Sequence, residues 1–309
     1  MAQHTTGAWR AGLGPRSRQS LSLLVRSFKH RNFRLFFTGQ FISLIGTWMQ
    51  SVAVSWLVYR LTGSAMALGA VGFVTHLPVF VLGLWGGFLA DRRDKRMLLV
   101  VTQVAAMAQA LALAILTLSG AATVWLVGGL AMVLGVVNAV DMPTRQAFVV
   151  EMVGKEDLHN AIALNSSMFN SARVLGPALA GVLVAIMGEG WCFMLNAVSY
   201  LAVIASLLLM RLPVQTARPA KEPMGAHIAA GLRHAWSDRS MRAILAGLCL
   251  TSLFGASFMI LWPVMVDAVL GHGAQGLGFV TAGTGLGSVA AALTLAIRRE
   301  SRGLWRVRV

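Results

Sequence analysis

The sequence predicts an all-α polytopic membrane protein. Hydrophobic residues make up 57% of the 309 residues and charged residues only 12%, whereas a soluble domain carries about 25% charge. The apolar residues gather in segments close to the ~20 residues that cross a ~30 Å hydrocarbon core. Residues 91–96 hold four cations and two carboxylates. That density of charge is excluded from hydrocarbon and predicts a tight hairpin between two membrane helices.

Eight apolar segments are long enough to span a membrane. They are residues 35–57, 65–90, 97–118, 122–140, 161–186, 191–210, 243–269 and 277–297. The chain accordingly divides into a basic tail (1–34), six membrane helices (35–210), a loop (211–242) and a partial second unit with two further helices (243–309).

Lysine and arginine positions predict the orientation. Of the 26 basic residues, 24 fall in the tail, in alternate loops and after the eighth segment, while Arg60 lies on the opposite side and Arg173 inside the fifth segment. Because positive charge stays cytoplasmic, both termini are expected inside a bacterial inner membrane. The net charge of +15 is therefore interpreted as a topological signal, and we expect no nucleic-acid partner.

The two longest hydrophilic stretches carry their own predictions. The tail lacks the apolar core and cleavage site of a secretory signal peptide, so the first apolar segment is expected to act as an uncleaved insertion signal. In the loop, residues 224–236 have the pattern of a short amphipathic helix. It either lies along the cytoplasmic surface or is an ordinary solvated linker helix.

A weak internal repeat supports the division into two units. Residues 89–96 align with 295–302, and residues 68–69 align with 277–278. The seventh and eighth segments therefore look like a second copy of the first two. Repeated halves are characteristic of secondary transporters. On this pattern a complete second copy needs four further helices.

Two motifs resemble a known family. Residues 87–96 resemble the signature between helices 2 and 3 of the major facilitator superfamily, although Asp94 stands where a glycine is usual. A second set is similar to the branch that contains bacterial siderophore exporters and multidrug (macrolide) efflux proteins. It comprises residues 141–147, Asp157-Leu158, Asn165, Arg173, Gly176-Pro177 and Gly181.

The resemblance implies a fold and an activity. The fold would be two six-helix bundles around a cavity that opens alternately to each side, and this chain would hold the complete N-terminal bundle plus two helices of the second. The activity would be proton-driven export of a small amphipathic molecule, a siderophore or a drug, without a bound cofactor. One departure is that residues 122–140 lack the arginine that many drug/proton antiporters carry in helix 4.

By resemblance, five residues form a conformational latch on the cytoplasmic side: Gly87, Asp91, Arg92, Arg96 and Asp141. Asp141 is expected to end the fourth helix, where Arg92 or Arg96 could pair with it. Gly83 and Gly87 have the spacing of a close helix contact. The alternative is a hairpin that fixes topology and has no gating role.

Arg173 is the outstanding polar residue inside a predicted helix. A charge near the midplane costs at least ~2.5–3.5 kcal/mol, so Arg173 should face a cavity or a protein partner. Its role is either substrate binding and gating, which suits an anionic substrate, or structural hydrogen bonding. Gln50, Asn165 and Asn170 are expected to line the cavity, although polar residues also join membrane helices to one another.

The middle of two helices carries further candidates. Gly176-Pro177, with Gly181, predicts a kink in the fifth helix, which either lets the cavity rim rock or is static. His76 lies near the middle of the second helix. It either relays a proton or is a hydrogen-bonded packing residue.

Nothing in the sequence predicts an enzyme. It contains no phosphate loop, no metal-ligand cluster and no nucleophile with a base, so we expect no cofactor and no bound metal. The predicted function is a secondary active transporter whose partners are a small-molecule substrate, protons and the lipid bilayer. The alternative is a truncated membrane protein with no transport activity of its own, and a scaffold that binds partners through residues 211–242 has little support.

Overall fold

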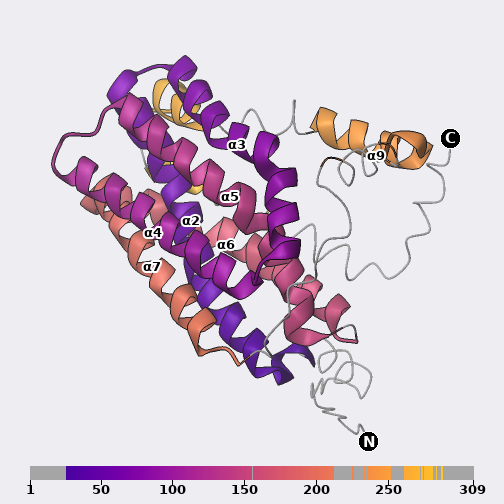
Figure 1. Ribbon diagram of the computed structural model, residues 1–309. Coiled ribbons are helices and arrows are strands. Elements are labelled where there is room, and N and C mark those ends of the chain that lie inside the picture. The colour runs from indigo at the N-terminus through magenta and orange to yellow at the C-terminus, as the bar shows by residue number, and fades with distance from the viewer. Residues whose placement is uncertain are drawn as a thin grey trace, which may run out of the picture.

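The computed structural model describes residues 26–154, 156–211, 235–251, 261–271 and 275–280, together with five isolated positions (225, 233, 273, 283 and 287), and the elements in these residues are helical. After the short 3₁₀ turn η1 (Arg26–Lys29), six long helices form a bundle (Figure 1). They are α2 (Arg31–Thr62), α3 (Ala65–Arg92), α4 (Lys95–Leu118), α5 (Val124–Val153), α6 (Leu158–Met187) and α7 (Glu189–Leu209). All six are long and apolar enough to cross a membrane.

The six helices coincide with the first six predicted segments, with one large difference. Helix α5 was predicted to end at residue 140 but continues to Val153. Pro143 removes only the hydrogen bond to the carbonyl of Ala139. The last turns of α5 place Phe148 and Met152 in the hydrophobic core, and burying such side chains stabilises by about 1.5–3 kcal/mol each. Packing therefore outweighs the proline.

The bundle has two chemically different ends. We call the end with η1, the Arg93-Asp94 turn and Arg211 the basic end, and the end with the turns at Gly63, Gly120 and Gly188 the far end. At the basic end the Asp94 carboxylate accepts a 2.7 Å hydrogen bond from the Met97 amide and caps α4. The charged hairpin predicted for residues 91–96 is thus a two-residue turn between α3 and α4.

Backbone contact between α3 and α5 depends on one glycine. A Cβ atom on Gly86 would lie 2.0 Å from the carbonyl oxygen of Ala139, whereas at Gly83 and Gly87 no described atom lies within 4 Å of such a Cβ. The predicted contact at Gly83 and Gly87 was therefore wrong. A glycine spacing in sequence does not specify which glycine faces the neighbour, because the helix rotation that decides this is set by the whole interface.

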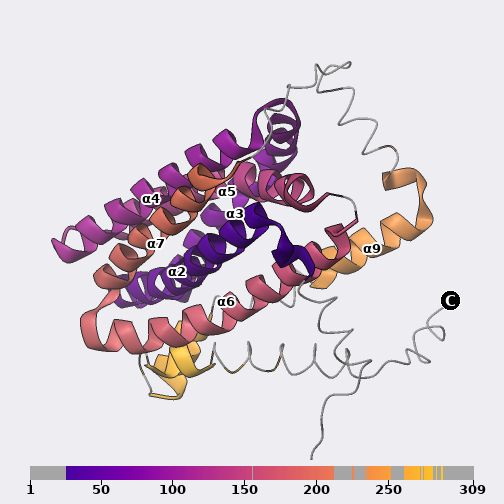
Figure 2. The same cartoon turned by 90° about the horizontal axis from the view of Figure 1, so that it is seen from below.

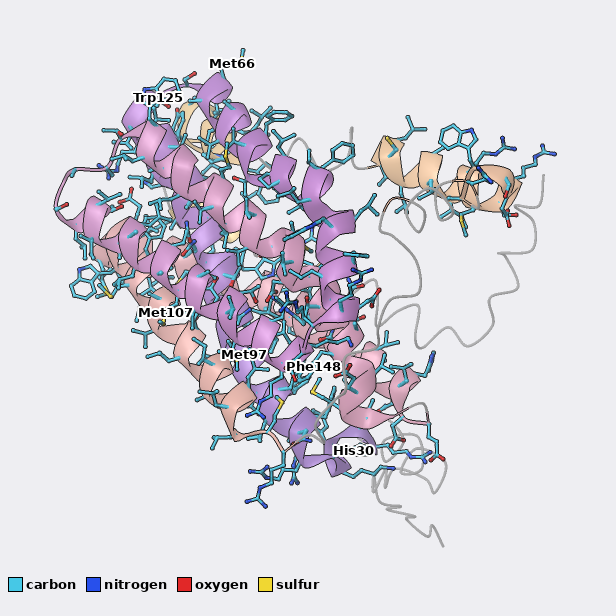
Figure 3. All side chains as sticks on the ribbon, in the orientation of Figure 1. His30, Met66, Met97, Met107, Trp125 and Phe148 are labelled. Atoms are coloured by element: carbon cyan, nitrogen blue, oxygen red, sulfur yellow. The ribbon has the colours of Figure 1, made fainter. Side chains whose placement is uncertain are left out.

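The outer surface of the bundle is apolar. Phe80 and Trp125 are each 87% exposed and Met66 is 82% exposed. Figure 3 shows Met66 and Trp125 on the periphery of the far end. Exposed side chains of this kind suit a hydrocarbon surrounding, where helices satisfy their own backbone groups and present apolar side chains to lipid.

The described part of the second unit meets the bundle at the far end. Helix α9 (Arg239–Leu250) buries none of its residues and lies beside the bundle (Figures 1 and 2). The short helix α11 (Trp262–Val264) and the π-helical turn η3 (Met265–Val269) follow. Trp262 and Val266 pack with Leu277 against Trp56 of α2. Most of the predicted helix at 224–236 and most of 277–297 lie outside the described residues.

Candidate functional site: a polar cavity in the helix bundle

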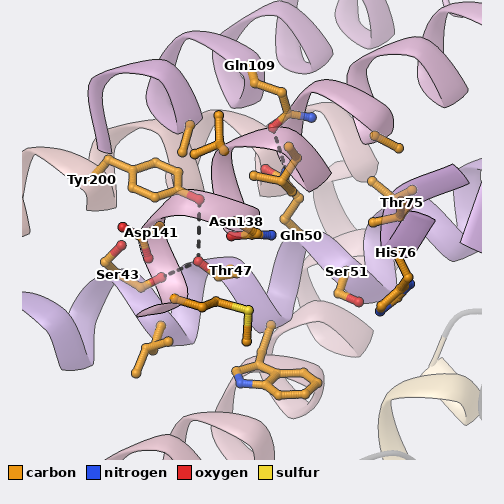
Figure 4. A pocket seen from close by; sticks show the side chains of 18 of the residues that line it. Ser43, Thr47, Gln50, Ser51, Thr75, His76, Gln109, Asn138, Asp141 and Tyr200 are labelled. Atoms are coloured by element: carbon orange, nitrogen blue, oxygen red, sulfur yellow. Dashed lines mark hydrogen bonds between the residues drawn. The ribbon is translucent and has the colours of Figure 1, made fainter. Parts of the chain in front are cut away.

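A cavity of about 330 Å³ lies inside the bundle, and all six long helices contribute to its wall (Figure 4). Its polar lining comes from amide and hydroxyl side chains, among them Gln40, Ser43, Thr47, Gln50, Gln103 and Gln109. Trp48 and Phe169 add aromatic surface. A wall with hydrogen-bonding groups set among apolar ones is typical of a small-molecule site.

Gln50 fixes the polar side of the cavity. Its Nε2 donates to Gln109 Oε1 of α4 at 3.0 Å, and its Oε1 accepts from Asn196 Nδ2 of α7 at 2.8 Å. Nearby, Thr47 Oγ1 lies 3.5 Å from the Tyr200 hydroxyl. Both contacts from Gln50 are buried, so they join α2, α4 and α7. Gln50 therefore lines the cavity and also joins helices.

Asp141 lies in the cavity wall with its side chain only 1% exposed. Its Oδ1 accepts from Thr102 Oγ1 at 2.9 Å and from Gln103 Nε2 at 2.7 Å, and its Oδ2 contacts Arg145 Nη2. Because α5 continues past residue 140, Arg145 stands one turn further along the same face. The sequence analysis was therefore wrong to place Asp141 at a helix end.

The arginines predicted to pair with Asp141 have other partners. Arg96 Nε and Nη2 each donate at 2.7 Å, to the carbonyls of Leu207 and Leu208 respectively, at the end of α7. The guanidinium of Arg92 lies 3.9 Å from the ring centroid of Phe88. The predicted pairing is thus replaced by the Asp141–Arg145 pair. Asp91 is exposed in the last turn of α3, and the latch role stays a prediction.

The candidates on α6 lie outside this cavity wall, where α6 contributes Phe169 instead. Arg173 sits in the middle of α6, with its guanidinium 5.7 Å from the ring centroid of Trp48. Asn170 is exposed and its Nδ2 donates to the Ser166 carbonyl at 2.9 Å. Asn165 Oδ1 is buried without a hydrogen-bond partner among the described residues.

Glycines at the predicted kink hold two neighbours close to α6. The helix runs without interruption from Leu158 to Met187 through Pro177. A Cβ on Gly176 would lie 2.4 Å from the Cβ of Trp48 in α2, and a Cβ on Gly278 would lie 2.4 Å from the Cα of Gly181. The prediction that this region rocks remains a prediction.

His76 lies on the cavity wall and is exposed. Its Nδ1 is 2.9 Å from the carbonyl oxygen of Gly72 in the preceding turn, so Nδ1 carries the proton that donates to that oxygen. Figure 4 shows the ring beside Ser51 and Thr75, at the opposite side of the view from Asp141. Whether His76 relays a proton stays a prediction.

Sequence reasoning missed a charge cluster at the basic end. Asp157 is only 2% exposed and meets Arg26 at 2.8 Å, Lys29 at 2.6 Å and His30 at 2.8 Å. Hydrogen bonds from Lys29 and then His30, assisted by the charge of Arg26, lower the pKa of Asp157 to about 2. The sequence does show a basic stretch before the first membrane helix. Which acidic residue it meets depends on the fold.

The cluster anchors the tail to the start of α6. The Ser27 amide and hydroxyl both bond to Asn160 Oδ1, at 2.9 and 2.7 Å. At the far end a matching ion pair joins Arg60 Nε to Glu189 Oε1 at 2.7 Å. Both ends of the bundle are therefore clamped by buried carboxylates.

A family model described as transmembrane secretion effector matches residues 24–304. The chain belongs to this family of major facilitator transporters. It is 26% identical over 263 residues to the staphyloferrin A transporter of Staphylococcus aureus, which covers 85% of the chain and 66% of that protein. It is 25% identical over 266 residues to the enterobactin exporter of Shigella flexneri, which covers 86% of the chain and 62% of that protein.

A third relative is an uncharacterized transporter of Bacillus subtilis, 26% identical over 176 residues, which covers 57% of the chain and 40% of that protein. The chain thus spans less than two thirds of the length of these three relatives. The family and its helices identify a multi-pass membrane protein of a transporter family, and the all-α fold expected from the sequence is confirmed.

Proposed function

We propose that this protein is a secondary active transporter that exports a small amphipathic molecule, a siderophore or a drug, by alternating access and at the expense of a proton gradient. The observation that carries the proposal is the cavity between α2–α7, with hydrogen-bonding side chains among apolar ones, in a chain of a transporter family. Two relatives are named for staphyloferrin A and enterobactin, which makes a siderophore the first substrate to test.

The lining of the cavity suits an amphipathic cargo. Amides and hydroxyls of α2 and α4 supply hydrogen bonds, while Trp48, Val54 and Phe169 supply apolar surface. A small number of polar groups among apolar ones orients the substrate while the affinity stays moderate. A transporter needs such moderate binding, because the cargo has to leave as well as enter.

Contacts at the two ends support alternating access. At the far end, Trp262, Val266 and Leu277 pack against Trp56 of α2, and Gly278 lies against Gly181 of α6. Helix α9, by contrast, buries none of its residues. We infer that this conformation is closed at the far end. In the opposite conformation, closed at the basic end, we infer a latch formed by Gly87, Asp91, Arg92 and Arg96. A difference of a few kcal/mol between the two states is enough for such a switch.

Transport by reconstituted vesicles tests the function. Labelled staphyloferrin A and enterobactin are offered to vesicles with the basic end outward and an acidic lumen. We expect accumulation that a protonophore abolishes and that Gln50→Leu reduces at least tenfold, because Gln50 orders three helices around the cavity. Phe80→Leu, on the exposed surface, is the matched control.

Accumulation equal to that of protein-free vesicles would overturn the proposal and favour the non-transporting alternative. Accumulation that the protonophore does not reduce would refute proton coupling, while the cavity would remain the proposed substrate site.

A further inference from the structure

Asp141 is the carboxylate that the cavity wall provides within the described residues. It lies twelve residues before the end of α5, beside Thr102 and Gln103, which are about two turns into α4. At 1.5 Å per residue this places it about 11 Å from the start of α4. A charge that only fixes the orientation of a hairpin in the membrane lies in the turn. The depth of Asp141 therefore calls for another role.

The bonding around Asp141 is that of an ionised group. Both of its oxygens accept, Oδ1 from Thr102 and Gln103 and Oδ2 from Arg145. A buried carboxylate keeps its charge only while a cation and hydrogen bonds compensate for lost water. Arg145 is the more exposed partner, at 20% against 1%, so the cation can turn toward the cavity while the carboxylate stays in place.

The other charged groups near this wall have partners of their own or lie elsewhere. On α4, Lys95 pairs with Glu151 at 2.7 Å and Arg96 binds the end of α7. Helix α3 contributes Asp91 and Arg92 at its last turn and His76 further along, α6 contributes Arg173 beside Trp48, and α7 contributes the Tyr200 phenol. Helix α2 presents neutral Gln40 and Ser43. Arg145 is therefore the cation that contacts Asp141 among the described residues.

Two buried atoms beside Asp141 have unused bonding capacity. Gln103 Oε1 and Arg145 Nε have no hydrogen-bond partner in the part of the chain that the structure describes, and the Gln103 residue is only 3% exposed. An amide donates to a carboxylate through nitrogen and accepts from a carboxylic acid through oxygen. Rotation of the Gln103 amide would therefore serve Asp141 in either protonation state.

We propose that Asp141 is the proton-binding residue of the cavity, with Arg145 as its counter-ion and Gln103 as its hydrogen-bond partner in both forms. The proton passes from cavity water to Oδ1, the oxygen that Gln103 contacts, and the Asp141–Arg145 ion pair breaks. Once the Gln103 amide has rotated, the new hydroxyl donates to Gln103 Oε1. Arg145 keeps its charge and faces the cavity, which gains one positive charge. The claim that this proton drives transport rests on the proposed function. The claim that Asp141 binds a proton does not.

Infrared difference spectroscopy of the chain in lipid vesicles tests the site directly. Acidification that stays above the range in which Asp157 takes up its proton should produce the carbonyl band of a buried carboxylic acid in the unaltered protein. Asp141→Asn should abolish that band, and Arg145→Gln should show it already at neutral pH because the counter-ion is gone. Asp238→Asn, an exposed cap of α9, is the matched control and should leave the band unchanged.

A band that survives in Asp141→Asn would overturn the proposal, as would its absence from the unaltered protein at every pH that leaves the helices folded. Asp141→Asn retains the shape of the side chain, and helical circular dichroism reports whether each variant folds. If the infrared result fails while transport still follows the proton gradient, another residue carries the proton. If it succeeds without transport, the site stands and the proposed function fails.

Discussion

At the residue scale, each buried carboxylate that the structure describes is paired with a basic side chain. Three carboxylates are buried among the described residues, Asp141, Asp157 and Glu189, and each meets a basic side chain: Arg145, the Arg26–Lys29–His30 group and Arg60. A buried carboxylate without a cation costs several kcal/mol. Each carboxylate buried among the described residues therefore lies where the fold supplies a cation.

Asp157 gives a pH-dependent stability. Its pKa falls from the ordinary 3.8 to about 2 in the folded protein, so folding favours the ionised form. This stabilisation is fully present above pH 3.8 and is lost as the pH falls toward 2. We expect Asp157→Asn to lower the temperature of unfolding in detergent at pH 6, and the difference from the unaltered protein to vanish near pH 2.

Glu156→Gln is the control for that experiment, because Glu156 is the exposed neighbour of Asp157. It should leave the unfolding temperature within the error of the measurement. An equal deficit of Asp157→Asn at pH 6 and pH 2 would show that the ionisation of Asp157 does not account for the stabilisation.

At the scale of helices, close packing is decided by which side of a helix a glycine occupies. Helices α3 and α5 touch backbone to backbone at Gly86, and α2 and α6 do so at Gly176. Small residues at such crossings allow dispersion contacts that lipid cannot supply. The carbonyl of Ala139, released from its helical hydrogen bond by Pro143, faces Gly86, so a proline and a glycine on different helices act at one crossing.

Gly86→Ala should separate α3 from α5. The new Cβ would lie 2.0 Å from a backbone oxygen, and overpacking of this kind costs about 1–3 kcal/mol. We expect a lower unfolding temperature in detergent. Gly83→Ala on the same helix meets no described atom within 4 Å and should be neutral or slightly stabilising. Equal losses for the two variants would disprove the contact.

At the scale of the whole molecule, the charge asymmetry between the two ends predicts the orientation in the membrane. The basic end carries η1, the Arg93-Asp94 turn and Arg211, while the far end carries Arg60, paired with Glu189. Cationic loops stay in the cytoplasm. We therefore propose that the basic end and the cavity side of Asp141 face the cytoplasm.

Single-cysteine labelling measures this orientation. With Cys192 and Cys249 replaced by serine, Ala121→Cys at the far end should react with an impermeant maleimide on intact cells. Arg93→Cys in the basic turn should react only after permeabilisation. Both positions are exposed. Labelling of Arg93→Cys on intact cells would invert the topology and refute the proposal.

Much of the fold was predictable from the sequence, but less of the site was. Apolar length located the six helices, and Gln50, expected at the cavity, lies on its wall. The partner of Asp141 was predicted wrongly, and the helix contacts expected at Gly83 and Gly87 are not found among the described residues. Arg173, Asn165 and Asn170 are polar residues of a membrane helix, yet the cavity wall on α6 is formed by Phe169. Helix rotation decides these outcomes, and periodicity is weak in helices that are apolar all round.

The sequence by itself determined that the chain crosses a membrane repeatedly, because lipid accepts only long apolar helices and excludes the charges of the turns. It also determined the family, through motifs that are local in sequence. Only the tertiary structure decided which acid meets which cation and that α5 carries Asp141 into the cavity wall. These depend on how far a helix continues and how it rotates against its neighbours, and packing over the whole bundle sets both.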